Sequence, residues 1–445
     1  MAVAISLPYD KTCPVIYDND THDDMYTDEY LLSLNSAGDI ALKGMMTSSC
    51  GWPYPMYPNL AYDPNFVFFW SYSGRSELVG KAIRSGMQHC PTPVAGSAVA
   101  LVKPASGVIA DTAPVDTPGA HLIVTEAHNA TPNEPLVVIM GCPPPPLASA
   151  YLMDPSISNL VVLGWMGGGP TENQLQNYND TVDPWATQIC LQRYRAVLFG
   201  VVFDQAALVD KTMLSDLPNT ELRQWMIDKN LPHAGLPNGH DYNGPAGIAM
   251  MRPDYVVAAK SKSWGGVDGS GNMFLVDDPN GKITMVTTAN QRVATTEWWR
   301  ALGNLAAYGN HPVHPVLAPY NGTPFAIPGH IEAEQFDYGG PNWSYHNLKT
   351  KNMDEYLTHY PTTYRVTDSV DFDAVTNTSG YALALLEPGE WIDYSVNVAT
   401  SGPCAVSIRV AGQGTGGAFH LEFNGVDQTG LLLVPDTGAG RIGRW

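Results

Sequence analysis

Short runs of apolar residues, separated by amphipathic segments and polar turns, dominate the first two-thirds of the chain. The clearest run, 136–140, has no polar position and predicts a strand that is buried on both faces. Prolines at 143–146 end it, because proline cannot donate to a ladder. Amphipathic stretches such as 27–38 and 122–130 predict helices between the runs. This alternation predicts an α/β domain: an open, mostly parallel sheet with helices on both faces.

Three further segments carry local predictions. The aromatic and proline-rich stretch 51–72 predicts a long loop, which either covers strand ends as a lid or packs as ordinary surface. The apolar segment 196–203 predicts a strand. Two short apolar runs, 273–276 and 283–287, flank Asp-Pro-Asn-Gly at 278–281, and this arrangement predicts a β-hairpin.

The pattern changes after residue 310. Segment 311–328 is rich in proline and shows no periodicity, so it predicts a stiff linker. Beyond it, residues 406–410 and 419–423 alternate apolar and polar positions, and glycine-rich turns separate such segments. This pattern is typical of an antiparallel β-sandwich of the jelly-roll kind. The predicted organisation is therefore a domain at 10–310, a linker at 311–328 and a second domain at 329–445.

The chain is acidic, with 43 acidic and 23 basic residues in 445 and a formal net charge of −20. This balance argues against nucleic acid and anionic membranes as partners. No stretch reaches the roughly eighteen apolar residues of a membrane helix, and no export signal is visible at the N-terminus. The six cysteines are scattered without metal-site spacing, which predicts buried free thiols and leaves one or two disulfides open. A homo-oligomer is compatible with the sequence.

An acidic stretch follows the first predicted strand, with five aspartates between Asp18 and Asp28. Carboxylates crowded at a strand end repel one another unless a cation or several donors hold them, and Ca²⁺ is the hard cation that prefers oxygen ligands. A solvated loop with an aspartate N-cap explains the pattern equally well. An EF-hand fits less well, because glycine is missing at its turn position, which is Asp23.

The acidic stretch resembles the D-x-D-P-G-x-D-D hallmark of the nucleoside hydrolase family (the inosine-uridine-preferring type). Asp18-x-Asp20 matches its first half. Either Asp23-Asp24 or Thr27-Asp28 supplies the closing pair, and the length from Asp28 to Gly44 favours Asp28. Other collinear segments are similar to family motifs: Met140-Gly141-Cys142-Pro143, 162–169, Asn177-x-Asn179 with Asp183-Pro184, and His240-Asp241.

The resemblance implies a Ca²⁺-dependent hydrolysis of a glycosidic bond. It implies an ion held by Asp20, Asp28, Asp241 and the carbonyl of Met140. Asp20 would also act as general base towards water, and His240 would serve the leaving group. Substrate-binding positions implied in the same way are Asp18, Asp24, Asn177, Asn179 and Asp183.

The C-terminal part resembles a family 6 carbohydrate-binding module, on Ile331-Glu332-Ala333-Glu334 and segment 389–396. The resemblance implies a structural calcium at Glu332 and Glu334 and sugar stacking on Tyr381 or Trp445. It also implies a module that stops before its last strands. The resemblance to such a module implies a location outside the cell or in a periplasm.

Together these features predict a calcium-dependent glycosidic-bond hydrolase, acting on a sugar or glycoside in a polysaccharide context. Two alternatives stay open: a non-catalytic calcium-dependent carbohydrate-binding protein and a true N-ribosyl nucleoside hydrolase.

Overall fold

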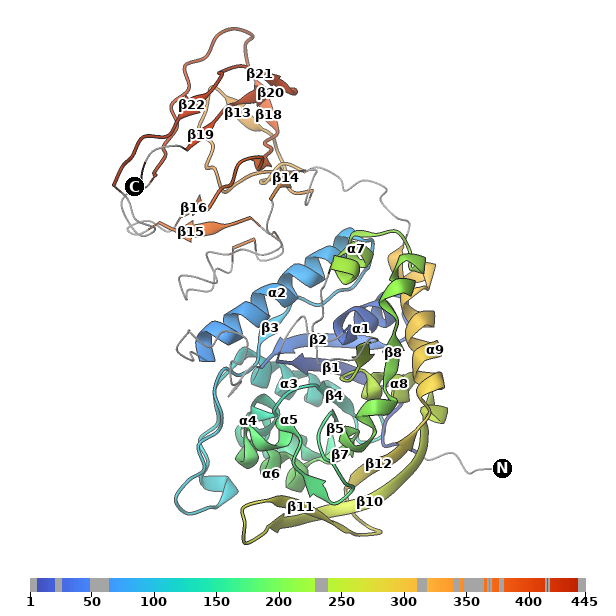
Figure 1. Cartoon of the computed structure of the whole chain (residues 1–445). Coiled ribbons are helices and arrows are strands. Elements are labelled where there is room, and N and C mark those ends of the chain that lie inside the picture. Colours follow the sequence, from blue (N-terminus) through green and yellow to red (C-terminus); the bar gives the residue numbers. More distant parts are fainter. Residues whose placement is uncertain are drawn as a thin grey trace. The chain divides into compact units, whose positions relative to one another are not determined.

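The chain divides into two compact units, Met1–His314 and Pro315–Trp445. The computed structural model describes residues 6–20, 26–48, 64–228, 239–309, 318–339, 344–347, 364–365, 368, 370–375, 380–412, 414 and 417–438. Figure 1 shows both units with their elements labelled.

The described part of the first unit is built on a ten-stranded sheet, in the order β3-β2-β1-β4-β5-β7-β12-β10-β11-β6. Neighbours from β3 to β12 run parallel, and β10, β11 and β6 continue the sheet antiparallel. The predicted open, mostly parallel sheet is therefore confirmed. Its strands are β1 (Pro14–Asn19), β2 (Ala41–Thr47), β3 (Val94–Ala95), β4 (Leu136–Met140), β5 (Val161–Trp165), β6 (Gln174–Leu175), β7 (Arg195–Leu198), β10 (Val256–Val267), β11 (Met273–Asp277) and β12 (Ile283–Ala289).

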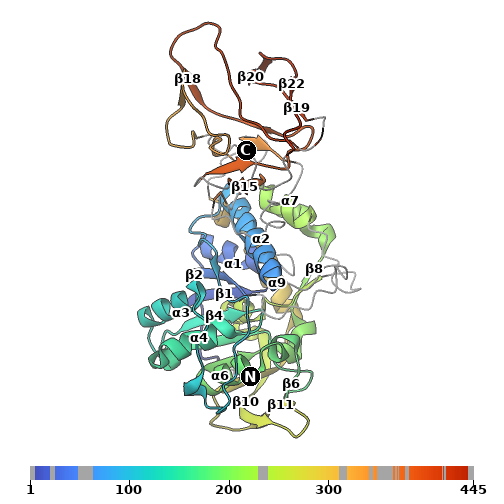
Figure 2. The ribbon, with the colours of Figure 1, turned by 90° about the vertical axis from the view of Figure 1, so that its left-hand side faces the viewer.

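The helices cover both faces of this sheet, as predicted. They are α1 (Thr27–Ser36), α2 (Pro64–Arg84), α3 (Pro118–Asn129), α4 (Pro145–Met153), α5 (Tyr178–Thr181), α6 (Pro184–Arg193), α7 (Glu221–Asp228), α8 (Pro245–Met251) and α9 (Gln291–Leu302). Figure 2 shows α3 and α4 on the opposite side of the sheet from α9. A separate two-stranded ladder joins β8 (Ala207–Val209) to β9 (Gly239–Asp241).

Alternate residues of the central strands point into two hydrophobic cores, one on each face of the sheet. Val137 and Ile139 of β4 pack with α1, α8 and α9 in one core. Leu136, Val138 and Met140 pack with α3, α4 and α6 in the other. Burial of both faces explains why β4 has no polar residue.

The structure corrects three local predictions. Residues 278–281 do not close a hairpin, because β10 lies between β11 and β12 and pairs with both. The strand expected at 196–203 ends at Leu198, and a 3₁₀ helix, Gly200–Gln205, follows. The loop expected at 51–72 is helical from Pro64 onwards, in α2, and residues 51–63 lie outside the described part.

The second unit is rich in short strands that pair two by two. They are β13 (Phe325–Ile327), β14 (Tyr345–His346), β15 (Phe372–Ala374), β16 (Tyr381–Leu383), β17 (Trp391–Ile392), β18 (Val396–Val398), β19 (Ala418–Phe419), β20 (Glu422–Phe423), β21 (Val426–Asp427) and β22 (Leu432–Leu433). Phe336, Tyr345 and Phe372 are central to its small core. The alternating segment 406–410 forms no strand. The strand at 419–423 is interrupted after Phe419.

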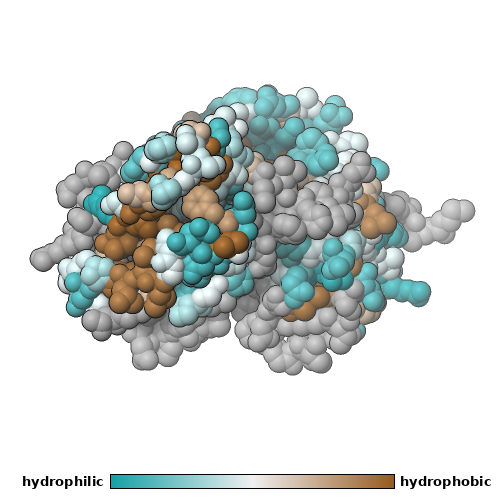
Figure 3. Space-filling view, turned by 90° about the horizontal axis from the view of Figure 1, so that it is seen from above, coloured by the Kyte–Doolittle hydropathy of each residue, from teal (hydrophilic) through white to brown (hydrophobic). Residues whose placement is uncertain are grey.

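Several apolar side chains of the second unit face solvent, among them Val406, Leu431 and Leu433. Figure 3, a view from above, shows hydrophobic residues gathered on this unit. Five cysteines are free thiols: Cys13, Cys90, Cys142, Cys190 and Cys404. Cys50 lies outside the described residues. None of the described helices combines the length and apolarity that a bilayer crossing requires.

Candidate functional site

Buried polar residues gather where β1 ends, at the carboxyl edge of the parallel strands. Asp18, Asn19 and Asp20 follow one another there, and none exposes more than 3% of its surface. The Asn19 side chain accepts from the backbone N–H of Asp20 at 3.0 Å. It also accepts from Nδ2 of Asn243 at 3.2 Å, across 224 residues of chain. The structure thus brings the β1 end to the loop between β9 and α8, at the edge where α/β proteins bind ligands.

Asp18 is a fully buried carboxylate at this edge. In the sheet it lies between Met46 of β2 and Met140 of β4. Its Oδ2 accepts from the hydroxyl of Ser48 at 2.7 Å, while Oδ1 is buried without a hydrogen-bond partner. Burial raises the pKa of Asp18 to about 7, although the donation from Ser48 works in the opposite direction. Burial therefore favours the protonated form of Asp18.

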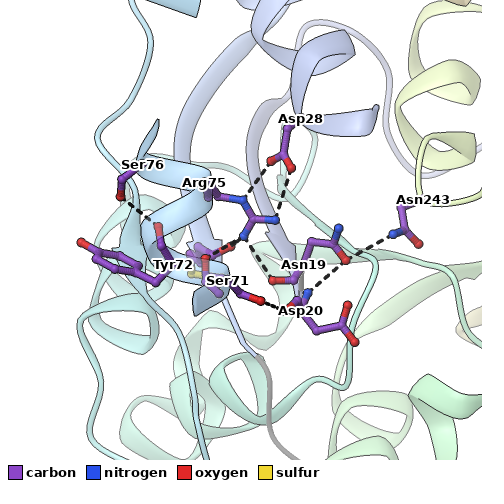
Figure 4. A network of polar contacts seen from close by, with 10 residues as sticks. Asn19, Asp20, Asp28, Ser71, Tyr72, Arg75, Ser76 and Asn243 are labelled. Carbon is purple, nitrogen blue, oxygen red and sulfur yellow. Dashed lines mark hydrogen bonds and ion pairs between the residues drawn. The ribbon is translucent and has the colours of Figure 1, made fainter. Parts of the chain in front are cut away.

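Asp28 lies in the first turn of α1 and makes an ion pair with Arg75 of α2 (Figure 4). Nε of Arg75 is 2.9 Å from Oδ1, and Nη2 is 3.4 Å from Oδ2. Nη1 donates to the backbone carbonyl of Asn19 at 3.1 Å and to Oγ1 of Thr47 at 2.9 Å. It also donates to the carbonyl of Met46. The guanidinium therefore ties α1 and α2 to the ends of β1 and β2.

Asp241, at the end of β9, is also held by donors on both oxygens. Oδ1 accepts from the hydroxyl of Thr27, and Oδ2 accepts from Nε1 of Trp298 at 3.1 Å. Burial raises the pKa of Asp241 to about 7, with a smaller opposing contribution from Thr27. The ring of Tyr26 packs edge-on against Trp298, with the two ring centroids 6.0 Å apart, and helps to fix the indole.

The donor set expected for calcium does not fit the ion in this arrangement. Calcium needs six to eight oxygens turned to one point, but Asp28 and Asp241 face Arg75 and Trp298, as described. The Met140 carbonyl accepts from the N–H of Met166 at 3.0 Å. Among the described side chains, no group of three or more His, Cys, Asp or Glu is arranged to hold a metal. The alternative ligands Asp23 and Asp24, and with them the substrate contact expected of Asp24, lie outside the described residues.

The expected substrate contacts near α5 and α6 hold the local backbone. Asn177 caps α5 and accepts from the N–H of Asn179 at 3.0 Å. Nδ2 of Asn179 donates to the carbonyls of Gly141 (3.2 Å) and Met166 (2.8 Å). Asp183 caps α6 by accepting from the N–H of Ala186 at 2.9 Å. Only Asn179 thus joins the strand-end cluster directly, through Gly141.

His240 is half-buried and precedes Asp241 on β9. Its ring stacks on Tyr242, with centroids 5.4 Å apart and planes 15° apart. Nδ1 is buried and has no hydrogen-bond partner. Burial lowers the pKa of His240, against a weaker opposing effect of Asp204. The imidazole is therefore mostly neutral at pH 7.

In the second unit the two expected calcium ligands differ in environment. Glu334 is buried, and burial raises its pKa. Glu332 is exposed and pairs with Nε2 of His330 at 2.9 Å. Tyr381 is partly buried and stacks on Tyr364, with the ring centroids 4.6 Å apart, so its ring is part of the core packing. The other expected stacking residue, Trp445, lies outside the described part of the chain.

Sequence reasoning missed Arg75, Asn19 and Asn243. Asn19 stands between two aspartates of the acidic stretch, so its position was visible although its role was not. Asn243 follows the noted His240-Asp241 pair closely. Arg75 had no such signal, because it lies just beyond the predicted loop at 51–72 and in none of the motifs of the sequence.

Comparisons with known proteins agree with the two resemblances seen in the sequence. Residues 362–441 match the model of the carbohydrate binding module (family 6), which confirms that prediction. None of the curated proteins compared with the chain matches it. Among solved structures, an inosine-guanosine nucleoside hydrolase is similar to the chain, at 14% identity and a TM-score of 0.49. The match covers 66% of this chain and 99% of the chain of that hydrolase.

Two further solved structures are similar in the same way. A purine-preferring ribonucleoside hydrolase from Gardnerella vaginalis has 17% identity and a TM-score of 0.45, covering 66% of this chain and 99% of its own. A nucleoside hydrolase-related hypothetical protein from Saccharophagus degradans, described as associated with carbohydrate metabolism, covers 85% of this chain and 93% of its own. Its identity is 13% and its TM-score 0.40. Likenesses of this order concern the fold and assign no substrate to this chain.

Proposed function

We propose that this protein is a carbohydrate-active hydrolase. Its first unit would cleave a glycosidic bond at the β1 strand end, and its second unit would bind polysaccharide outside the cell or in a periplasm. The observation that carries the proposal is the contact between Asn19 and Asn243 at 3.2 Å. It joins the carboxylates that follow β1 to the loop that follows Asp241, at the ligand-binding edge of the sheet.

The groups at this edge suit a neutral ligand rich in hydroxyls. Ionised carboxylates accept hydrogen bonds, and side-chain amides both donate and accept. Asp18, Asp20 and Asn19 are all buried there, so a hydroxyl that replaces water gains a partner in a poorly solvated place. An anionic ligand would meet repulsion from the same carboxylates, in a chain of net charge −20. A sugar or glycoside meets these requirements.

Carboxylates beside a sugar ring also favour cleavage of the glycosidic bond. Positive charge develops on the ring in the transition state, and nearby carboxylates stabilise it. Asp20 is the proposed general base, which takes a proton from the attacking water. His240 is mostly neutral at pH 7, so its role towards the leaving group would be that of a hydrogen-bond partner. Calcium takes no part in this scheme, because Asp28 and Asp241 are engaged by Arg75 and Trp298.

Activity is tested by incubating the full chain with oligosaccharides, with aryl glycosides and with nucleosides, and measuring released sugar. We expect turnover of a glycoside. Asp20→Asn should lower the rate by about 10²-fold or more, the usual contribution of a general base. Asp254→Asn is the matched control, because Asp254 is exposed and pairs with Arg252 at the surface. Equal rates in the wild type and the Asp20 variant would refute the assigned role.

A second candidate is a sugar-binding protein without turnover. It is favoured by one observation: hydrogen-bond donors already occupy Asp28 and Asp241, two of the expected metal ligands. The donors are Arg75, Thr27 and Trp298. Calorimetric titration with the same sugars separates the candidates. Sugar binding without release of product, in both wild type and Asp20→Asn, would support the binding protein. Cleavage of nucleosides alone would instead identify a nucleoside hydrolase.

A further inference from the structure

Arg75 is surrounded by oxygen atoms from three elements, α1, β1 and β2. Its guanidinium contacts both carboxylate oxygens of Asp28, the carbonyls of Asn19 and Met46, and the hydroxyl of Thr47. A carboxylate, backbone carbonyls and a hydroxyl at strand ends form the type of ligand set that a hard cation takes in proteins. In this protein the guanidinium of Arg75 binds these oxygen atoms instead (Figure 4).

The charge of Arg75 is also required where it lies. Its side chain is fully buried, and burial of a charge without a partner is very costly. Burial lowers the pKa of Arg75, but Asp28, Tyr17 and Asp18 together outweigh burial and the pKa is raised overall. The charge of Arg75 also acts on Asp18, because it opposes the rise in the pKa of the Asp18 carboxyl group. One guanidinium thus compensates the carboxylates around the ends of β1 and β2.

The same contacts connect Arg75 to the residue that acts in the proposed function. Nη1 binds the carbonyl of Asn19, and the next residue, Asp20, has its own carbonyl bound by Ser71 at 2.6 Å. Ser71 and Arg75 lie one turn apart on α2. The helix therefore holds the peptide groups on both sides of the Cα atom of Asp20. These contacts fix the position of the Asp20 backbone, from which its carboxylate extends.

We propose that Arg75 is a built-in cation of the strand-end site, so that the first unit holds its acidic residues and binds its sugar without a divalent metal. Calcium bound to Asp28 would have to displace the guanidinium of Arg75. The displaced guanidinium would then be a second buried positive charge beside the calcium ion. Arg75 is a positioning residue: it acts through Asp28 and the β1 backbone. Its effect on sugar binding rests on the proposed function, whereas its effect on calcium binding and stability does not.

The test measures calcium binding by calorimetric titration, and the melting temperature with calcium or with a chelator, on the full chain. The variant Glu332→Gln/Glu334→Gln serves as the background, because these residues are the calcium ligands expected in the second unit. In this background we expect no calcium isotherm and the same melting temperature with calcium and with chelator. A calcium isotherm accompanied by a rise of several degrees would overturn the proposal.

Variants of Arg75 supply the second measurement. Arg75→Met removes the charge and most donors, and should lower the melting temperature more than Arg84→Met. Arg84 is the matched control, since it lies on the same helix and pairs with Glu221 at 2.8 Å. Adding Asp28→Asn to Arg75→Met should recover part of the loss, because it removes the carboxylate left unpaired. Equal losses from Arg75→Met and Arg84→Met would refute the role of Arg75.

If Arg75→Met does not fold, the calcium titration of the background still decides the proposal. Sugar binding is read separately on Arg75→Lys, which keeps the charge but not the planar fork. A protein that binds no sugar either with or without calcium would refute the proposed function and leave the inference about Arg75 standing. Sugar binding by the background variant only in the presence of calcium would overturn the inference.

Discussion

Replacing Asp18 by Asn should stabilise the first unit at alkaline pH. Asp18 is fully buried in the sheet, and burial raises its pKa from 3.8 to about 7. The folded state therefore binds a proton that the unfolded state has already released between about pH 4 and pH 7. The free energy of unfolding falls as the pH rises through this window and is constant above it. Asn has the shape of the protonated acid and no charge to ionise.

The size of the effect follows from the pKa difference. Each unit corresponds to about 1.4 kcal/mol, so a rise of about three units amounts to roughly 4 kcal/mol at most. Relaxation around the ionised carboxylate reduces this, and we expect a gain of about 2 kcal/mol for Asp18→Asn at pH 8. The hydroxyl of Ser48 can turn to accept from the new amide. At pH 4 the gain should disappear, because Asp18 is then protonated in the folded protein.

Calorimetric melting of the wild type and Asp18→Asn at pH 4, 6 and 8 would measure this. Asp254→Asn is the control: Asp254 is exposed and its partner Arg252 lowers its pKa, so its removal should bring no gain at pH 8. If Asp18→Asn is less stable than wild type at pH 8, the ionised carboxylate is favoured by its surroundings. The assignment of a raised pKa to Asp18 would then be wrong.

Three other substitutions test separate contacts. Gly141→Ala would place a methyl group 2.4 Å from Cγ of Asn243; it should break the bridge between β1 and the β9–α8 loop and weaken sugar binding, by calorimetric titration, by about tenfold or 1.4 kcal/mol. Trp298→Phe removes the donor to Asp241 and should cost about 2 kcal/mol in denaturant unfolding, because a buried acceptor loses its partner. Arg365→Met removes a guanidinium that lies 3.6 Å from a phenyl ring centroid and should lower the melting temperature of the second unit alone.

The central half of the sheet could be predicted because its strands are buried on both faces. Segment 136–140 is apolar throughout, and the strand found there has the same bounds. The antiparallel extension gave no comparable signal. Strand β10 (Val256–Val267) is mostly half-exposed and carries lysines, serines and glycines among its apolar positions. Without β10, the strands on either side of 278–281 resembled a hairpin. Pairing partners depend on the whole sheet, which local periodicity does not reveal.

The polar edge of the site was predictable to the extent that it lies in one segment. Asp18 and Asp20 follow an apolar run, so they could be assigned to a strand end. Contacts that join distant segments were not predictable from spacing. Asp28 is buried, as a metal ligand would be, yet its partner is Arg75, which lies 47 residues further along the chain. A buried carboxylate needs a compensating cation, but the sequence does not say whether a metal or a side chain provides it.

The choice between these two cations follows from where Asp28 lies. It stands in the first turn of α1, after the stretch of chain that separates it from Asp20, and its carboxylate meets α2. An arginine on α2 can reach such a carboxylate and also, with the rest of its fork, the carbonyls at the ends of β1 and β2. Calcium would require Asp20, Asp28 and Asp241 to turn towards one point. The position of Asp28 on α1 and the arginine on α2 are therefore two parts of one arrangement, in which a guanidinium binds the strand-end oxygens.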